Sequence, residues 1–130
     1  MSMRCLNVLL AALWLAACTE PAPGSQAPAG PTQLQSIPAA FHGVWAATET
    51  DCEPPAETRL EIAADRLRFY ESSGPVSAVE AREPAEILIT IPLTGEGAAS
   101  IRTFRYRLLE DGQVLFDVRN GLTRRRCPTA

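Results

Sequence analysis

The sequence lacks lysine and has a single histidine, His42, among its 130 residues. Any acid–base or nucleophilic site that uses histidine would depend on His42. Its position next to Gly43 is more typical of a residue that leads into a strand. No serine stands in a Gly-x-Ser-x-Gly motif, which marks the nucleophile of one large class of hydrolases. We therefore expect no catalytic residues and no enzymatic activity.

Long hydrophobic segments are also absent. The longest, residues 6–17, has about a dozen residues, which is too few for a helix to cross about 30 Å of hydrocarbon. It follows Arg4, ends in small residues and precedes no basic cluster. This is the pattern of a secretory signal rather than of a membrane-spanning helix. We predict that residues 1–17 are a signal peptide that is removed on export.

The end of this segment, Leu15-Ala16-Ala17-Cys18, resembles the bacterial lipobox of small Gram-negative lipoproteins. The resemblance implies cleavage before Cys18 and acylation of this cysteine, and two or more acyl chains hold a protein stably on a membrane. By the rule of that family, a threonine rather than an aspartate at Thr19 favours the outer membrane, with the domain facing the periplasm. An ordinary signal peptide with an incidental cysteine is the alternative.

There is no excess of positive charge. Without residues 1–17 the chain keeps 11 arginines and 15 acidic residues, a net charge of −4. Because nucleic acid is bound by a net basic face, we expect no nucleic acid among the partners. Cys-x-x-Cys spacing is missing, and Asp51, Glu53 and Glu57 do not have the spacing of a calcium loop. We expect no metal and no cofactor.

Of the four cysteines, Cys5 would leave with the signal and Cys18 would carry the lipid. Cys52 and Cys127 would remain, and such a pair in an oxidising compartment is typical of a disulfide. It would close a loop of about 76 residues and contribute roughly 4–5 kcal/mol in the chain-entropy model. We predict a Cys52–Cys127 disulfide.

Residues 18–37 are rich in proline, alanine, glycine and glutamine and have no hydrophobic period. This composition is typical of an extended tether. We therefore divide the chain into a signal peptide (1–17), a lipidated tether (18–37) and one folded domain (38–130).

The folded domain has the pattern of short strands joined by tight turns. The expected strands are 43–48, 58–63, 66–71, 76–82, 86–91, 100–109, 114–118 and 122–127. Asp111-Gly112 and Asn120-Gly121 are hairpin signals, and 72–75 reads as a break between strands. We predict an all-β fold, a small antiparallel up-and-down barrel of about eight short strands, with a sandwich as the alternative. Strands this short would leave a barrel that its own side chains nearly fill.

The beginning of the domain, Pro38-Ala39-Ala40-Phe41-His42-Gly43-Val44-Trp45, resembles the opening of calycin barrels such as lipocalins and small inhibitors of bacterial metalloproteases. In that family a Gly-x-Trp, here Gly43 and Trp45, closes one end of the barrel. The resemblance implies that an arginine of the last strand, one of Arg124, Arg125 and Arg126, packs across the indole ring. The free N-terminal segment that those inhibitors insert into a protease is replaced here by a tether.

Alternation along the strands predicts which side chains face the core. The expected core includes the inward row Val114, Phe116 and Val118, and the aromatic residues Trp45, Phe69, Phe104, Tyr106 and Phe116. The outward arginines Arg66, Arg68, Arg105 and Arg107 would form a basic stripe for an anionic partner if their strands were neighbours. Interspersed glutamates would otherwise neutralise them.

No sequence motif decides the function. We expect a non-catalytic envelope lipoprotein whose barrel binds a protein or a cell-wall partner. One alternative is an inhibitor of a secreted protease or lysozyme. The other is a carrier of small apolar ligands, which would need a cavity of about 300 Å³ or more.

Overall fold

The computed structural model describes residues 30–83 and 85–129. The predicted signal peptide, Cys18 and residues 19–29 of the predicted tether lie outside these ranges. The described part forms ten strands and three short 3-10 turns. The turns are η1 (Ala39–Phe41), η2 (Thr50–Cys52) and η3 (Glu110–Gly112). The strands are β1 (Thr32–Leu34), β2 (Gly43–Ala46), β3 (Leu60–Ile62), β4 (Arg66–Arg68), β5 (Ser72–Pro75), β6 (Ala78–Glu83), β7 (Glu86–Gly95), β8 (Ala98–Leu109), β9 (Val114–Asp117) and β10 (Thr123–Arg126).

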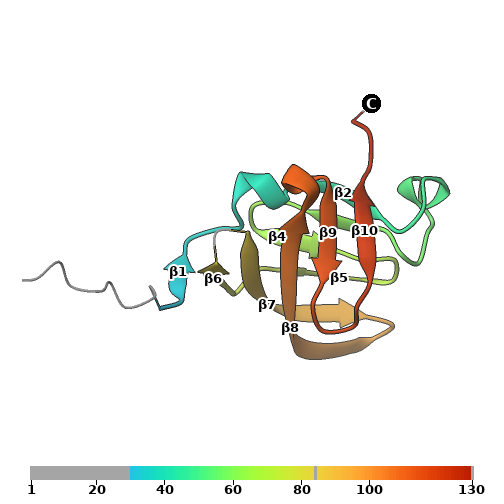
Figure 1. Cartoon of the computed structure of the whole chain (residues 1–130). Coiled ribbons are helices and arrows are strands. Elements are labelled where there is room, and N and C mark those ends of the chain that lie inside the picture. Colours follow the sequence, from blue (N-terminus) through green and yellow to red (C-terminus); the bar gives the residue numbers. More distant parts are fainter. Residues whose placement is uncertain (1–29, 84, 130) are drawn as a thin grey trace, which may run out of the picture.

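Eight of the strands close into an antiparallel barrel (Figure 1). Its order is β2-β3-β4-β5-β7-β8-β9-β10, and β10 pairs with β2 to complete the ring. Strands that pair within the ring follow one another along the chain, with two exceptions. β6 lies between β5 and β7 in the sequence but outside the ring, and the last strand, β10, pairs with β2. The predicted up-and-down barrel is confirmed, and the sandwich is excluded.

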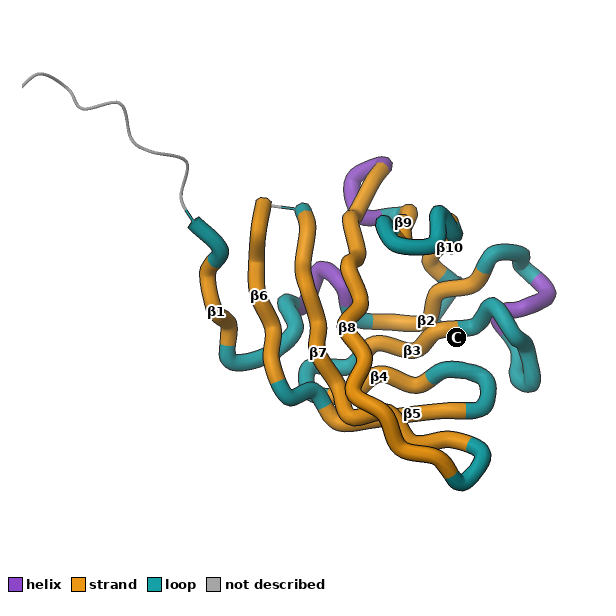
Figure 2. The backbone as a smooth tube through the Cα atoms, turned by 90° about the horizontal axis from the view of Figure 1, so that it is seen from below, coloured by secondary structure: helices purple, strands orange, loops and turns teal. Residues whose placement is uncertain are grey.

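Two strands extend the sheet outside the ring, as Figure 2 shows. β6 pairs with the first half of β7, and β1 pairs with β6. The folded part therefore begins before Pro38: β1 is paired, and Ile37 is buried in the core. The sequence conceals this because a three-residue strand is too short to show an alternating pattern.

The interior of the barrel is filled with apolar side chains. Trp45, Leu60, Leu67, Ile89 and Tyr106 are all 0 % exposed. Alternation along β7 turns its isoleucines inward, as expected for a strand with one face against a core. Packed against this core, the ring of Phe69 lies 4.9 Å from that of Phe104, measured between centroids. Both of these phenylalanines are partly buried.

Residues 72–75, expected to break the sheet, instead form β5. Pro75 is the last residue of this strand, a position at which its missing N–H does not remove a backbone hydrogen bond from the middle of the sheet. Gly74 is required by a close backbone approach: a Cβ there would lie 2.1 Å from the carbonyl oxygen of Pro92 on β7. Glycine therefore allows β5 and β7 to pack against each other here, whereas in the sequence it suggested a turn.

The facing of β9 was predicted one residue out of phase. Asp117 pairs with Tyr106, which points into the barrel, so Asp117 and Leu115 face inward. Val114, Phe116 and Val118 belong to the opposite face. Phe116 is consequently not a core residue, although Val114 is buried on the outer side. The alternation misled because residues on both faces of this strand are apolar.

Strand lengths also differ from the expectation. β7 has 10 residues and β8 has 12, longer than the short strands that the turn signals suggested. The β7–β8 hairpin therefore continues beyond the end of β9 to its own turn (Figure 1).

Candidate binding surface

One end of the barrel is closed by the Gly-x-Trp segment. Trp45 donates its indole N–H to the carbonyl oxygen of Phe41 at 2.9 Å. Arg126 pairs with Trp45 across β10 and β2, and its guanidinium carbon lies 4.1 Å from the ring centroid. The same guanidinium donates to the carbonyl oxygens of His42 and Ala40. Arg126 is therefore the arginine, among the three candidates, that packs on the indole.

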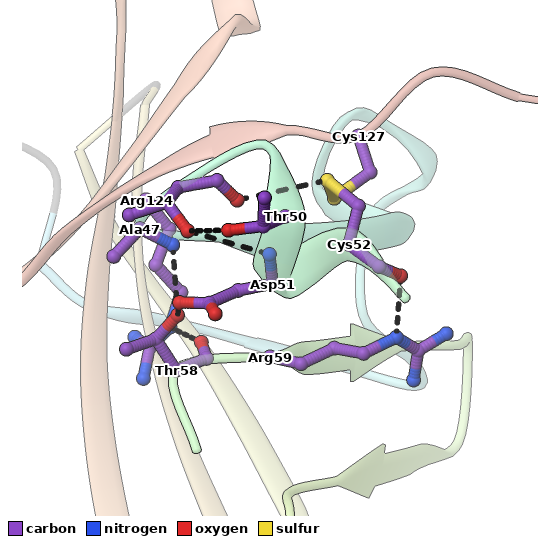
Figure 3. Close-up of a disulfide and its surroundings, with 9 residues drawn as sticks. Ala47, Thr50, Asp51, Cys52, Thr58, Arg59, Arg124 and Cys127 are labelled. Carbon is purple, nitrogen blue, oxygen red and sulfur yellow. Dashed lines mark hydrogen bonds between the residues drawn. A yellow bond between two sulfur atoms is a disulfide. The ribbon is translucent and has the colours of Figure 1, made fainter. Parts of the chain in front are cut away.

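The predicted disulfide is formed (Figure 3). Cys52 at the end of η2 is bonded to Cys127, which directly follows β10. The loop around it is held by several hydrogen bonds: Arg59 Nε donates to Cys52 O at 3.0 Å, and Thr58 Oγ1 donates to an oxygen of Asp51 at 2.6 Å. Asp51 is thus a structural acceptor. In the described ranges, no group of three or more His, Cys, Asp or Glu is arranged to hold a metal.

His42 lies beside this end. Its Nε2 is 2.8 Å from the carbonyl oxygen of Ile37, and the ring is half-buried. It lines a surface hollow of about 780 Å³, together with Cys52, Glu53, Arg59 and Arg126. The charges in this lining are mixed in sign, so the hollow does not select a ligand of one charge.

The outward arginines do not make a stripe. Arg66 and Arg68 are on β4, which is not a neighbour of β8. On β8, Arg105 and Arg107 both bind the carboxylate of Glu86 on β7, with Arg107 Nε at 2.8 Å. Glu86 is 1 % exposed. Burial acts to raise the pKa of Glu86, but the hydrogen bonds and charges of the two arginines outweigh it, and the pKa lies below its ordinary value.

Three polar side chains lie inside the barrel; Tyr106 was predicted as a core residue, whereas the sequence did not identify Asp117 or single out Arg124. Tyr106, Asp117 and Arg124 are buried, and Arg124 Nε donates to Thr58 O at 2.7 Å. Burial raises the pKa of the Tyr106 phenol; the charge of Arg124 opposes this rise and that of Asp117 adds to it. Burial also lowers the pKa of Arg124. We assign these residues to the structure of the core, where Arg124 joins β10 to the segment before β3.

The most exposed strand segment is the far part of the β7–β8 hairpin. We call residues 86–91 and 103–109 its proximal half, and residues 92–95 and 98–102 its distal half. Residues 98–102 are all exposed, and Ile101 is 77 % exposed. β9 pairs with β8 only from Tyr106 to Leu109. Beside this part of β8 lies a surface hollow of about 440 Å³, lined by Ile101, Arg102, Phe104, Asp117 and Arg119 among others.

Comparison of the chain with family models, with curated proteins and with solved structures finds no match. Among the residues that the structure describes, no helix is both long and apolar enough to cross a bilayer.

Proposed function

We propose that this chain is a non-catalytic lipoprotein of the bacterial envelope, anchored through acylated Cys18 in the outer membrane and facing the periplasm. In this proposal the small barrel, a relative of the calycins, binds a protein or cell-wall partner on its outer surface. The observation that carries the binding role is the filled interior. The largest side chains that point inward are almost completely buried against one another, so the interior has no room for a ligand. Recognition therefore has to use the outer surface of the barrel.

An inhibitor of a secreted protease or lysozyme is the second candidate. It is supported by the stacking of Arg126 on Trp45 and by the single disulfide of the described part, features that the small calycin-like inhibitors share. Insertion of a free N-terminal segment is disfavoured because β1 is paired with β6. An apolar-ligand carrier has less support, since Trp45, Leu60 and Tyr106 occupy the space that a ligand would need.

The anchor is tested by expressing the full chain and its Cys18→Ala variant in a Gram-negative host. The wild-type protein should partition into detergent, and mass spectrometry should find acyl chains on Cys18 as the first residue. The variant should be released as a soluble periplasmic protein. An unmodified terminus at another residue of the wild-type protein would contradict the anchor.

The binding role is tested by cross-linking in intact cells, followed by identification of whatever is joined to the barrel. A partner joined in stoichiometric amount supports the role. A purified full-length protein that inhibits a protease or a lysozyme at a one-to-one ratio would move the assignment to the second candidate.

A further inference from the structure

The distal half of β8 has one paired side and one open side. On the paired side, β7 runs beside β8 without a register shift from Glu86↔Arg107 to Gly95↔Ala98. β7 is itself supported by β5 at this level. On the other side β9 has already ended, because its last partner on β8 is Tyr106. The sheet therefore has an open edge along residues 98–103 (Figure 2).

Two backbone hydrogen bonds in the C-terminal part of β8 show which residues turn their backbone to this edge. Leu108 N donates to Ala85 O at 2.8 Å, which places an even-numbered residue on the side of β7. Arg105 O accepts from Val118 N at 2.9 Å, which places an odd-numbered residue on the side of β9. Successive residues of a strand turn their N–H and C=O to alternate sides.

Ala99, Ile101 and Thr103 accordingly present their backbone groups to the open edge. Thr103 confirms this: its carbonyl oxygen accepts a bond of 2.8 Å from Arg119 Nη1, on the side of β9. In the described part of the chain no strand pairs with the edge groups of Ala99 and Ile101. A row of unpaired strand groups of this kind is a template for another strand.

The charges beside the edge indicate what kind of strand would fit. Arg102 and Arg119 line the adjoining hollow, and both are exposed. The acid of the lining, Asp117, is buried and accepts the backbone N–H of Arg119 at 3.0 Å. The accessible charge of the hollow is therefore positive, which suits an acidic partner.

Side-chain alternation narrows the partner further. Ile101 and Arg102 are consecutive strand residues, so their side chains lie on opposite faces of the sheet. A strand added beside them would place one residue against the apolar Ile101 and the next on the face of Arg102. The matching segment alternates apolar and acidic residues.

We propose that the open edge of β8, from Ala99 to Thr103, binds an extended acidic segment of a partner protein by strand addition. This deepens the proposed binding role and rests on it. The other open edge, that of β1, is a poorer template because β1 has three residues and follows Pro31. A second copy of the chain is a less suitable occupant: antiparallel pairing of two β8 edges about Ile101 would place each Arg102 opposite Ser100 of the other copy and diagonal to its Arg102, so the arginines would gain no acidic partner.

The experiment uses the full-length protein in detergent and a capped peptide of about seven residues, the length of an ordinary strand. The peptide alternates glutamate and valine. In the free protein, amide exchange should be fast at Ala99, Ile101 and Thr103 and slow at Ser100 and Arg102. The peptide should slow exchange at the first three only. A matched peptide with lysine in place of glutamate should give no protection.

Two substitutions separate strand addition from other contacts. Ile101→Pro removes an edge N–H without removing a bond to β7 and should weaken peptide binding about tenfold. Ile101→Thr keeps the N–H and should change binding by less than about threefold. Thermal unfolding shows whether Ile101→Pro is folded, and Ala99→Pro repeats the test if it is not.

Three results would overturn the proposal. The first is no protection of Ala99, Ile101 and Thr103 at saturating peptide; the second is unchanged binding by folded Ile101→Pro. The third is protection of these amides in a dimer without peptide, which would make a second copy the occupant. None of these measurements depends on Cys18 or on cross-linking in cells, so failure here is distinguishable from failure of the proposed anchor and envelope role.

Discussion

In the proximal half of the β7–β8 hairpin, β7 directs Ile87, Ile89 and Ile91 into the core, and β9 covers the far side of β8 from Tyr106 to Leu109. In the distal half the same strand pair continues in register, but β8 carries alanine and serine, and its far side is open. The ladder between the two strands is the same in both halves. The difference lies in what surrounds it: buried apolar area stabilises the proximal half, whereas the distal half is held by backbone pairing with little burial.

The largest effect is expected in the proximal half. Ile89→Ala should lower the free energy of unfolding by about 2–5 kcal/mol, because the side chain is fully buried and its removal leaves a cavity. Urea denaturation measures this loss. A change below about 1 kcal/mol would show that the barrel collapses around the gap and that its interior is loosely packed.

An intermediate effect is expected at the buried carboxylate of the same half. Glu86→Gln should cost about 1–3 kcal/mol at neutral pH, since two guanidinium groups lose their charged acceptor. Arg68→Gln, at an exposed position of β4, is the matched control and should cost less than about 0.5 kcal/mol.

This effect should depend on pH with a definite sign. The pKa of Glu86 is below its ordinary value of 4.5 in the folded protein. Its ionised form therefore contributes stability above the ordinary carboxyl range, and this contribution is lost as the pH falls through the folded-state pKa. The difference in unfolding free energy between wild type and Glu86→Gln should shrink on acidification. A difference that stays constant would mean that the stabilisation does not come from the charge of Glu86.

The smallest effect is expected in the distal half. Ile101→Ala, the same chemical change as Ile89→Ala, should alter the free energy of unfolding by no more than about 0.5 kcal/mol, because Ile101 is 77 % exposed. A loss comparable to that of Ile89→Ala would show that the distal half packs against something in solution, and the comparison between the halves would fail.

Much of this fold could be predicted from local signals. The turns at Asp111-Gly112 and Asn120-Gly121, the apolar strand 86–91 and the Cys52–Cys127 pair each indicated their structure within a few residues. These signals suffice for an up-and-down barrel because most strands of the ring pair with the next one along the chain; β6 is the interruption, since it lies between β5 and β7 in the sequence but pairs with β7 outside the ring. Gly43 and Trp45 also indicated the closed end, although sequence alone could not choose among the three consecutive arginines. Register chose Arg126, by placing it opposite Trp45.

The candidate surface could not be predicted in the same way, because it depends on where a neighbouring strand stops. Nothing in residues 98–102 (Ala-Ala-Ser-Ile-Arg) marks an open edge in the sequence; the edge is open because β9 ends at Asp117. The phase of β9 was missed for a related reason. Asp117 is a charged residue on an inner face, and its place is decided by the pairing of β9 with the strands of Tyr106 and Arg124 on its two sides, which the pattern within 114–118 does not show.

The pairing of β1 with β6 limits the length of the tether between the barrel and the proposed anchor. From Cys18 to Thr32 there are about fourteen residues, which span at most about 50 Å when fully extended. A tether that was unpaired as far as Pro38 would have a maximum length nearly half as great again. If the proposed anchor is correct, the barrel would stay within about 50 Å of the membrane surface. A partner would therefore have to enter that layer to be bound.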